Sequence, residues 1–169
     1  EKALPARVEG GHEQDVLNWW DAACRALEGL MRELEVAGAE CQALRAVSVD
    51  GTSGTLVCLD GAGQPVRPAI MYNDARARAE AEEITALAGA FCQRLGYRFE
   101  ASFSLAKIAW VQRNEPEVFA RTVFLAHQAD YIQGCLTGDF KVSDYSNALK
   151  TGYDLVEECW PSWLDQLSG

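Results

Sequence analysis

The sequence predicts an α/β domain in which a mixed sheet, containing an antiparallel meander, is flanked by helices. Three observations support this fold class. Short apolar runs separated by tight turns fill residues 44–72, an amphipathic stretch precedes them at residues 15–36, and several shorter helical segments follow them. With 169 residues, of which 49% are hydrophobic, the chain is long enough to bury the core of one domain.

The first half of the chain reads as an arm, a helix and three strands. Residues 1–14 are polar and turn-rich, which favours an extended arm or an edge strand. Apolar side chains recur at helical spacing over residues 15–36, and Asp15 is a plausible N-cap. Three β-rich runs follow, and tight turns between them predict an antiparallel meander. The runs cover residues 44–50, 55–59 and 66–72.

The second half is mainly helical. We expect Asp74 to cap a helix over residues 75–88, and Ser104 to cap a helix over 105–114 that has Leu105, Ile108 and Val111 facing inward. A short helix restarts at Pro116, a strand covers 122–126, and Gly138 ends a helix over 129–136. The polar cluster at 143–147 is typical of a helix cap, although Asp144 and Asn147 could instead line a cleft.

Composition excludes several partners. The net charge of −10 argues against nucleic acid, because binding to phosphates relies on Lys and Arg. The sequence shows neither a signal peptide nor a long apolar span, so we expect no membrane partner. The six cysteines form no CxxC pair, which leaves a zinc site without support. An even number of cysteines permits disulfides, but buried free thiols and a cytoplasmic location are the favoured interpretation.

Small and polar residues at two strand ends are the candidate ligand site. Thr52, Ser53 and Gly54 follow one apolar run, and Asn73 and Asp74 close another. Asp and Asn supply the acceptors and donors that a polyol needs. The alternatives are an ordinary tight turn at 50–55, and a purely capping role for Asp74.

Three further residues are considered for the site. Arg76 either pairs with Glu80 on a helix surface or orients Asp74. We expect Lys107 to be solvated, although it could reach toward a cleft. His127 has no evident partner nucleophile or metal cluster in sequence, so we do not expect it to be a catalyst.

Six segments taken together resemble the FGGY carbohydrate kinases. The similarity is greatest to pentulose kinases of the xylulokinase-like and ribulokinase-like branches, and it covers essentially the whole chain. The segments are Glu13-Gln14-Asp15 with Trp19-Trp20, residues 49–55, residues 68–76, residues 103–110, Asp130-Tyr131 with Leu136-Thr137-Gly138, and residues 143–148.

The resemblance implies an actin-like (ribonuclease H-like) fold that is incomplete here. Residues 1–169 would be the central part of the N-terminal, sugar-binding domain. The phosphate-loop hairpin, the Asp that acts as catalytic base and the C-terminal ATP domain would lie outside the chain. The implied activity is ATP-dependent phosphorylation of a sugar hydroxyl, with D-xylulose or D-ribulose as the expected substrate. ATP and Mg²⁺ would be held mainly by parts outside this chain, so we expect no catalytic residue or metal ligand in it and no activity from it alone.

The resemblance also adds residues to the site. Ser53 and Gly54 match positions where glycerol kinases carry Arg-Glu and xylulokinases carry Met-His. Ser102 replaces a substrate-contacting Tyr, and Phe103 lies in the same segment. The implied substrate-binding set is therefore Thr52, Ser53, Gly54, Asn73, Asp74, Ser102 and Phe103. The alternatives are a non-catalytic sugar-binding or interaction module of the same fold, and a glycerol or gluconate kinase. The full-length protein could be a homodimer.

Overall fold

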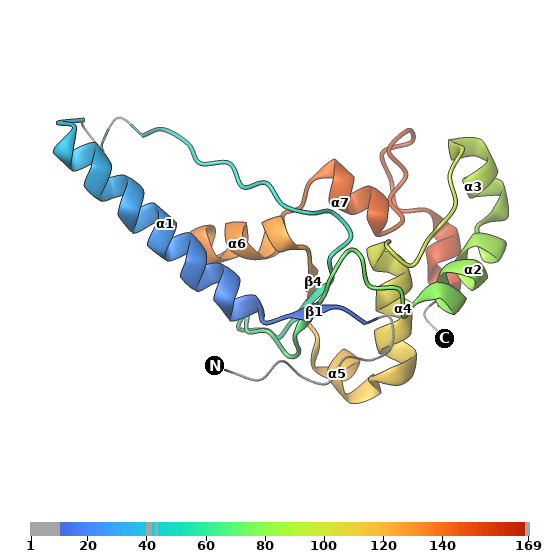
Figure 1. The fold of residues 1–169 in the computed structure, drawn as a ribbon. Coiled ribbons are helices and arrows are strands. Elements are labelled where there is room, and N and C mark those ends of the chain that lie inside the picture. Colours follow the sequence, from blue (N-terminus) through green and yellow to red (C-terminus); the bar gives the residue numbers. More distant parts are fainter. Residues whose placement is uncertain (1–10, 40–41, 43, 168–169) are drawn as a thin grey trace.

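The computed structural model describes residues 11–39, 42 and 44–167 (Figure 1). Its strands are β1 (Glu13–Gln14), β2 (Val57–Leu59), β3 (Ala69–Ile70) and β4 (Phe124–Ala126). Its helices are α1 (Val16–Val36), α2 (Arg78–Leu87), α3 (Gly89–Leu95), α4 (Ser104–Asn114), α5 (Pro116–Arg121), α6 (Gln128–Thr137), α7 (Tyr145–Lys150) and a 3-10 helix at Ser162–Leu167.

The four short strands form one antiparallel ladder in the order β4–β2–β3–β1. Val57 lies opposite Ala126, and Glu13 lies opposite Ile70. The two strand pairs are joined by an isolated bridge between Leu56 and Ile70, whose two N–H···O distances are 2.9 and 3.0 Å. The predicted hairpin of residues 55–59 and 66–72 is therefore present, and its turn lies at Asp60–Gly63 as expected.

Alternation along β2 divides the core into two layers, because successive side chains of a strand point to opposite faces. Val57 and Leu59 face α1 and α6 in a cluster that includes Val16 and Tyr131. Leu56 and Cys58 face α4 and α5 in a cluster that includes Val111. The sheet is thus covered on both faces, as expected for an α/β domain.

A third cluster lies beside the sheet and is mostly aromatic. It packs α2 and α3 against the segment 97–106 and the 3-10 helix near the end of the described chain. Phe99 is its centre, with ring centroids of Phe91, Phe103, Tyr97 and Trp163 between 5.4 and 6.4 Å away. Offset and edge-to-face pairs of this kind add stability beyond the area that they bury.

Several sequence predictions are confirmed. Helix α1 begins after Asp15, whose side chain accepts a hydrogen bond from the Leu17 N–H at 3.1 Å. Gly138 ends α6 with a φ of 77°, a left-handed conformation that favours glycine. Asp144 caps α7 by accepting from the Asn147 N–H at 2.9 Å. The predicted arm at 1–14 is partly tested: β1 is an edge strand, while residues 1–10 lie outside the described part of the chain.

The expected first strand of the meander is wrong. Residues 44–50 form an extended but unpaired segment, which runs from the tip of α1 back to the body of the molecule (Figure 1). Its place beside β2 is taken by β4, which comes from much later in the chain. Among the described strands all pairs are antiparallel, so the mixed sheet is not seen in this part of the chain.

Both predicted caps of the central helices are also wrong. Helix α2 starts after Ala77 without a side-chain cap, because the Asp74 carboxylate is engaged elsewhere. Helix α4 starts after Phe103, and Ser104 is its first residue rather than its cap. The sequence did not predict α3 as a separate helix; it follows α2 after Ala88 and ends at Gly96, whose φ is 73°.

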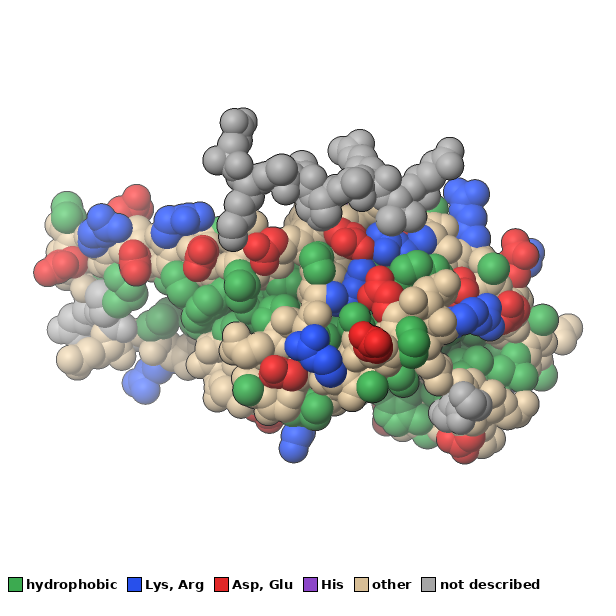
Figure 2. Space-filling view, turned by 90° about the horizontal axis from the view of Figure 1, so that it is seen from below, with side chains coloured by type: hydrophobic (Ala, Val, Ile, Leu, Met, Phe, Trp, Pro, Cys, Tyr) green, Lys and Arg blue, Asp and Glu red, His purple; other side chains and the backbone are tan. Residues whose placement is uncertain are grey.

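Helix α1 extends away from the body and carries an apolar face that is only partly covered. Figure 2 shows hydrophobic side chains in a band along this end of the molecule, beside rows of charged side chains. Leu17, Leu30, Met31 and Val36 are among its exposed residues. None of the described helices combines the length and apolar character that crossing a bilayer needs. The described cysteines, at 24, 58, 92, 135 and 159, are all free.

Gly134 illustrates how tightly α6 packs. A Cβ atom at this position would collide with the Phe140 ring, whereas one at Gly29 in α1 would meet open space. Overpacking a core costs about 1–3 kcal/mol, and replacing a helical Gly by Ala gains about 0.5–1 kcal/mol.

We therefore expect Gly134→Ala to lower the free energy of unfolding by about 1–2 kcal/mol, and the matched Gly29→Ala to raise it by about 0.5–1 kcal/mol. Urea denaturation followed by circular dichroism measures both. Equal effects of the two substitutions would contradict this packing of Phe140.

Candidate functional site

Three chain segments meet where the ladder ends. The Thr55 hydroxyl accepts a hydrogen bond from the Tyr72 N–H at 3.2 Å, which joins the ends of the two central strands. Gly54 adopts a φ of 81° and lies so close to the Ser102 carbonyl that any Cβ would collide with it. The segments 52–55, 72–74 and 100–103, which are distant in sequence, are therefore neighbours.

Lys107 of α4 connects the first and third of these segments by hydrogen bonds. Its Nζ donates to the carbonyl oxygens of Gly54 and Ser102, both at 2.8 Å, and its side chain is fully buried. The prediction of a solvated lysine is thus wrong. Burial lowers the pKa of Lys107 to about 7, because desolvation penalises the charged form.

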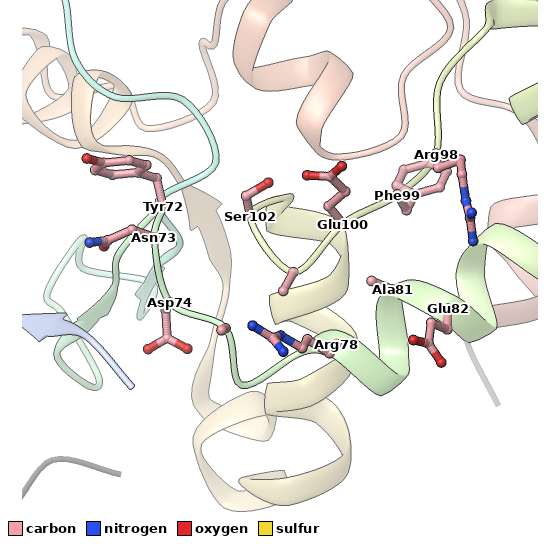
Figure 3. A pocket seen from close by; sticks show the side chains of 12 residues that line it. Tyr72, Asn73, Asp74, Arg78, Ala81, Glu82, Arg98, Phe99, Glu100 and Ser102 are labelled. Carbon is pink, nitrogen blue, oxygen red and sulfur yellow. The ribbon is translucent and has the colours of Figure 1, made fainter. Parts of the chain in front are cut away.

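A cavity of about 470 Å³ opens between the second and third segments (Figure 3). One wall is the run Tyr72, Asn73 and Asp74, and the facing wall is the segment 98–102. Helix α2 closes a further side with Arg78 and Glu82. Most of the lining residues carry polar or charged side chains, among apolar ones such as Phe99, which suits a ligand with both hydroxyl groups and an apolar face.

The structure brings some predicted site residues together and not others. Asn73, Asp74 and Ser102 all line the cavity. Asn73 is exposed, and its Oδ1 lies 2.6 Å from His12 Nδ1. Gly54 contacts the Ser102 carbonyl from outside the cavity, and Ser53 beside it is half-buried. Neither Ser53 nor Gly54 lines the cavity.

Thr52 and Phe103 have other partners. Thr52 Oγ1 lies 3.0 Å from Gln128 Oε1 and 3.2 Å from Thr55 Oγ1, so its hydroxyl joins the 52–55 segment to α6. Phe103 is buried in the aromatic cluster, with the Lys150 ammonium 3.8 Å from its ring centroid. Neither side chain lines the 470 Å³ cavity.

Asp74 is at the centre of a buried ion cluster. Its side chain is fully buried and accepts two guanidinium hydrogen bonds from Arg76, at 2.8 and 2.9 Å, plus the backbone N–H of His12 at 2.5 Å. Arg76 also pairs with Glu13 at 2.7 Å. Of the two roles open to Arg76, the structure shows the orientation of Asp74. Glu80 pairs instead with Arg113.

These bonds decide the charge state of Asp74. Burial alone would raise the pKa of this carboxyl group, but the hydrogen bonds from Arg76 and His12 lower it below its ordinary value of 3.8. The carboxylate also points away from Ser102 and Glu100 (Figure 3). Asp74 therefore acts first as a structural anchor for the Asn73 turn.

Several lining residues were missed at the sequence level. Tyr72 lies directly beside Asn73 and is 45% exposed, although it follows a buried strand. Arg78, Arg98 and Glu100 also contribute to the cavity. The position of Tyr72 at a strand end beside two predicted residues was an available signal; Arg98 and Glu100 lie in a loop whose path the sequence does not define.

Ser104, His127 and Asp130 form a hydrogen-bonded chain that superficially resembles a catalytic triad. His127 Nε2 lies 2.9 Å from Ser104 Oγ, and its Nδ1 lies 2.8 Å from Asp130 Oδ2. All three residues are buried, and Asp130 also accepts from Ser143. A nucleophile with no exposed surface cannot meet a substrate, so the chain serves to link α4, α6 and the start of α7.

The described cavity has no features of a metal or phosphate site. No group of three or more His, Cys, Asp or Glu side chains within this part of the chain could hold a metal ion. The cavity contains two arginines but no glycine-rich loop that could cradle phosphates. We therefore assign neither Mg²⁺ nor ATP to these residues.

The buried Asp74 gives a pH-dependent prediction. We expect Asp74→Asn to lower the free energy of unfolding at pH 7 by about 3 kcal/mol, because it leaves Arg76 and the His12 N–H poorly paired. A lowered carboxyl pKa stabilises the fold above its ordinary value of 3.8, and this stabilisation is lost as the pH falls through the lowered value. The difference in the free energy of unfolding between wild type and variant should hence shrink below about pH 4. Urea denaturation at pH 7, 5, 4 and 3 measures this difference. A difference that does not change with pH would contradict the prediction.

Comparison with known proteins places this geometry in a family. Residues 2–168 match the model of the N-terminal domain of the FGGY family of carbohydrate kinases. A xylulose kinase from Streptomyces rubiginosus is 37% identical over 146 residues, which cover 85% of this chain and 29% of that protein. The fold superposes on crystal structures of a xyloylose kinase from Brucella ovis (TM-score 0.83, 30% identity) and a xylulose kinase from Rhodospirillum rubrum (TM-score 0.78, 31% identity).

The match extends over nearly all of this chain but only part of its relatives. Each of the two crystal structures covers 98% of this chain, which in turn covers 34% of each of theirs. The chain thus spans about a third of the length of the proteins it matches. It belongs to the FGGY family of carbohydrate kinases and corresponds to their N-terminal domain.

Proposed function

We propose that this chain is the sugar-side wall of a kinase that phosphorylates a hydroxyl of a pentulose, with D-xylulose as the first candidate. The observation that carries the proposal is a polar cavity between segments 72–74 and 98–102, both of which contact segment 52–55, in a chain similar to xylulose kinases. D-ribulose is the second pentulose to test.

The cavity offers the chemistry that a polyhydroxylated chain requires. Asn73 has an amide that both donates and accepts, and Ser102 has a hydroxyl that does the same. Tyr72 adds an exposed aromatic ring with a polar tip, a combination suited to the apolar face and hydroxyl edge of a sugar. Ser53 is half-buried and lies next to Gly54, whose backbone contacts Ser102 in the cavity wall.

The remaining parts of the reaction belong, on this proposal, to a longer polypeptide. Residues 1–169 would be the central part of an actin-like N-terminal domain. The phosphate loop, the catalytic Asp and the MgATP-binding domain would come from outside the chain.

The test uses the full-length protein that contains these residues, assayed with ATP against D-xylulose, D-ribulose, glycerol and gluconate. We expect a pentulose to give the highest kcat/KM. Ser53→Phe and Asn73→Ala should each raise the KM for that sugar by about tenfold, which corresponds to about 1.4 kcal/mol of lost binding, and leave the KM for ATP unchanged.

The matched control is Asn114→Ala at the end of α4, which removes an amide of the same kind that bonds only to the Trp110 carbonyl within the described chain. It should leave both KM values unchanged. Asp74→Ala is a poor test, because it disrupts the ion cluster. Unchanged pentulose kinetics in both site variants, or a preference for glycerol or gluconate, would refute the assignment.

A further inference from the structure

Lys107 is the largest fully buried side chain in the described structure, and its position needs an explanation. Burying an ammonium group is costly unless it is compensated. Within the described residues no carboxylate lies within ion-pair distance of Lys107; its recorded partners are the two carbonyls of Gly54 and Ser102. A methionine of similar length would fill the same space without the desolvation cost.

The charges around Lys107 do little to compensate this cost. Asp74 favours the ammonium form, whereas Lys150 and Arg76 oppose it, and burial remains the dominant effect on the pKa. The neighbours of Lys107 on α4 include Ser104 and Val111, both buried. The gain from this lysine must therefore lie in what its two hydrogen bonds hold together.

The two carbonyls belong to two different segments of the chain. Ser102 lines the cavity, whereas Gly54 lies in segment 52–55, which contacts this wall from outside the cavity. The two backbones approach so closely that a Cβ at Gly54 would collide with the Ser102 carbonyl oxygen. Two carbonyl oxygens converging at short range repel each other, unless a donor of positive charge lies between them.

We propose that Lys107 is a positioning residue: its amino group holds the Gly54 and Ser102 carbonyls together and thereby fixes the 98–102 wall of the sugar site against segment 52–55. The ligand in this proposal rests on the proposed function, whereas the tie between the two loops does not. Displacement of a binding wall by about 1 Å can cost a hundredfold in activity, so loss of the tie should affect sugar affinity without Lys107 touching the sugar.

The experiment compares Lys107→Met with Val111→Ala in the full-length protein. Val111 lies one turn further along α4, is equally buried and packs on Leu56 and Ile70, so its truncation disturbs the core and not the loops. Two quantities are measured: amide hydrogen exchange of peptides covering 52–55 and 100–103 without sugar, and the KM values for D-xylulose and ATP.

We expect Lys107→Met to speed exchange at least tenfold in both segments and to raise the D-xylulose KM at least tenfold, while the ATP KM changes less than twofold. Val111→Ala should lower the melting temperature without either effect. Lys107→Gln, whose amide keeps two donors, should give intermediate values and replaces the Met variant if that one does not fold.

Each remaining outcome has one meaning. Unchanged exchange in both segments overturns the positioning role, whatever the kinetics. If Lys107→Met and Val111→Ala show the same exchange rates and the same KM for D-xylulose, Lys107 has only a structural role. If Lys107→Met speeds exchange but the wild-type protein phosphorylates no pentulose, the link between the two segments is supported and only the proposed function is refuted.

Discussion

The Asp74 carboxylate is the constraint on which this part of the fold depends. A fully buried carboxylate is tolerated only when nearly all of its acceptor capacity is used. Here Arg76 supplies a bidentate pair and His12 supplies a backbone N–H, so β1, the turn after β3 and the start of α2 are joined at one point. Glu13 extends the cluster to Arg67, which pairs in turn with Glu115 at the start of α5.

Such polar ties matter because the strands are very short. Ladders of two or three residues provide few backbone hydrogen bonds, so the positions of loops at their ends must be fixed by side chains. Lys107 does this between Gly54 and Ser102, and His127 does it between Ser104 and Asp130. The loops at the site are thereby held by side-chain hydrogen bonds in addition to the strands.

Local signals predicted the elements that local interactions determine. Periodicity and Asp15 predicted α1, and Gly138 predicted the end of α6, because a cap or a left-handed turn needs only neighbouring residues. Residues 44–50 have strand-like composition, but a strand also needs a partner, and in the described structure β2 pairs with β4 instead. Asp74 and Ser104 are good caps by type, yet other partners engage their side chains. Asp74 binds the nearby Arg76 and the distant His12, and Ser104 binds the distant His127.

The candidate site likewise combines features that local signals predict with features that depend on long-range packing. The two strand ends could be predicted as neighbours, because a hairpin brings them together, and Thr55 and Tyr72 do so. The third segment entered the predicted site only through the family resemblance, because its place depends on how α4 packs. The burial of Lys107 was not predicted; its spacing with Ser104 and Val111 on one helical face was the available hint. Gly54 adopts a left-handed conformation that depends on glycine itself and not on the side chain of Ser53 beside it. The close approach of this loop to Ser102 is therefore set by the glycine, since any Cβ there would collide with the Ser102 carbonyl.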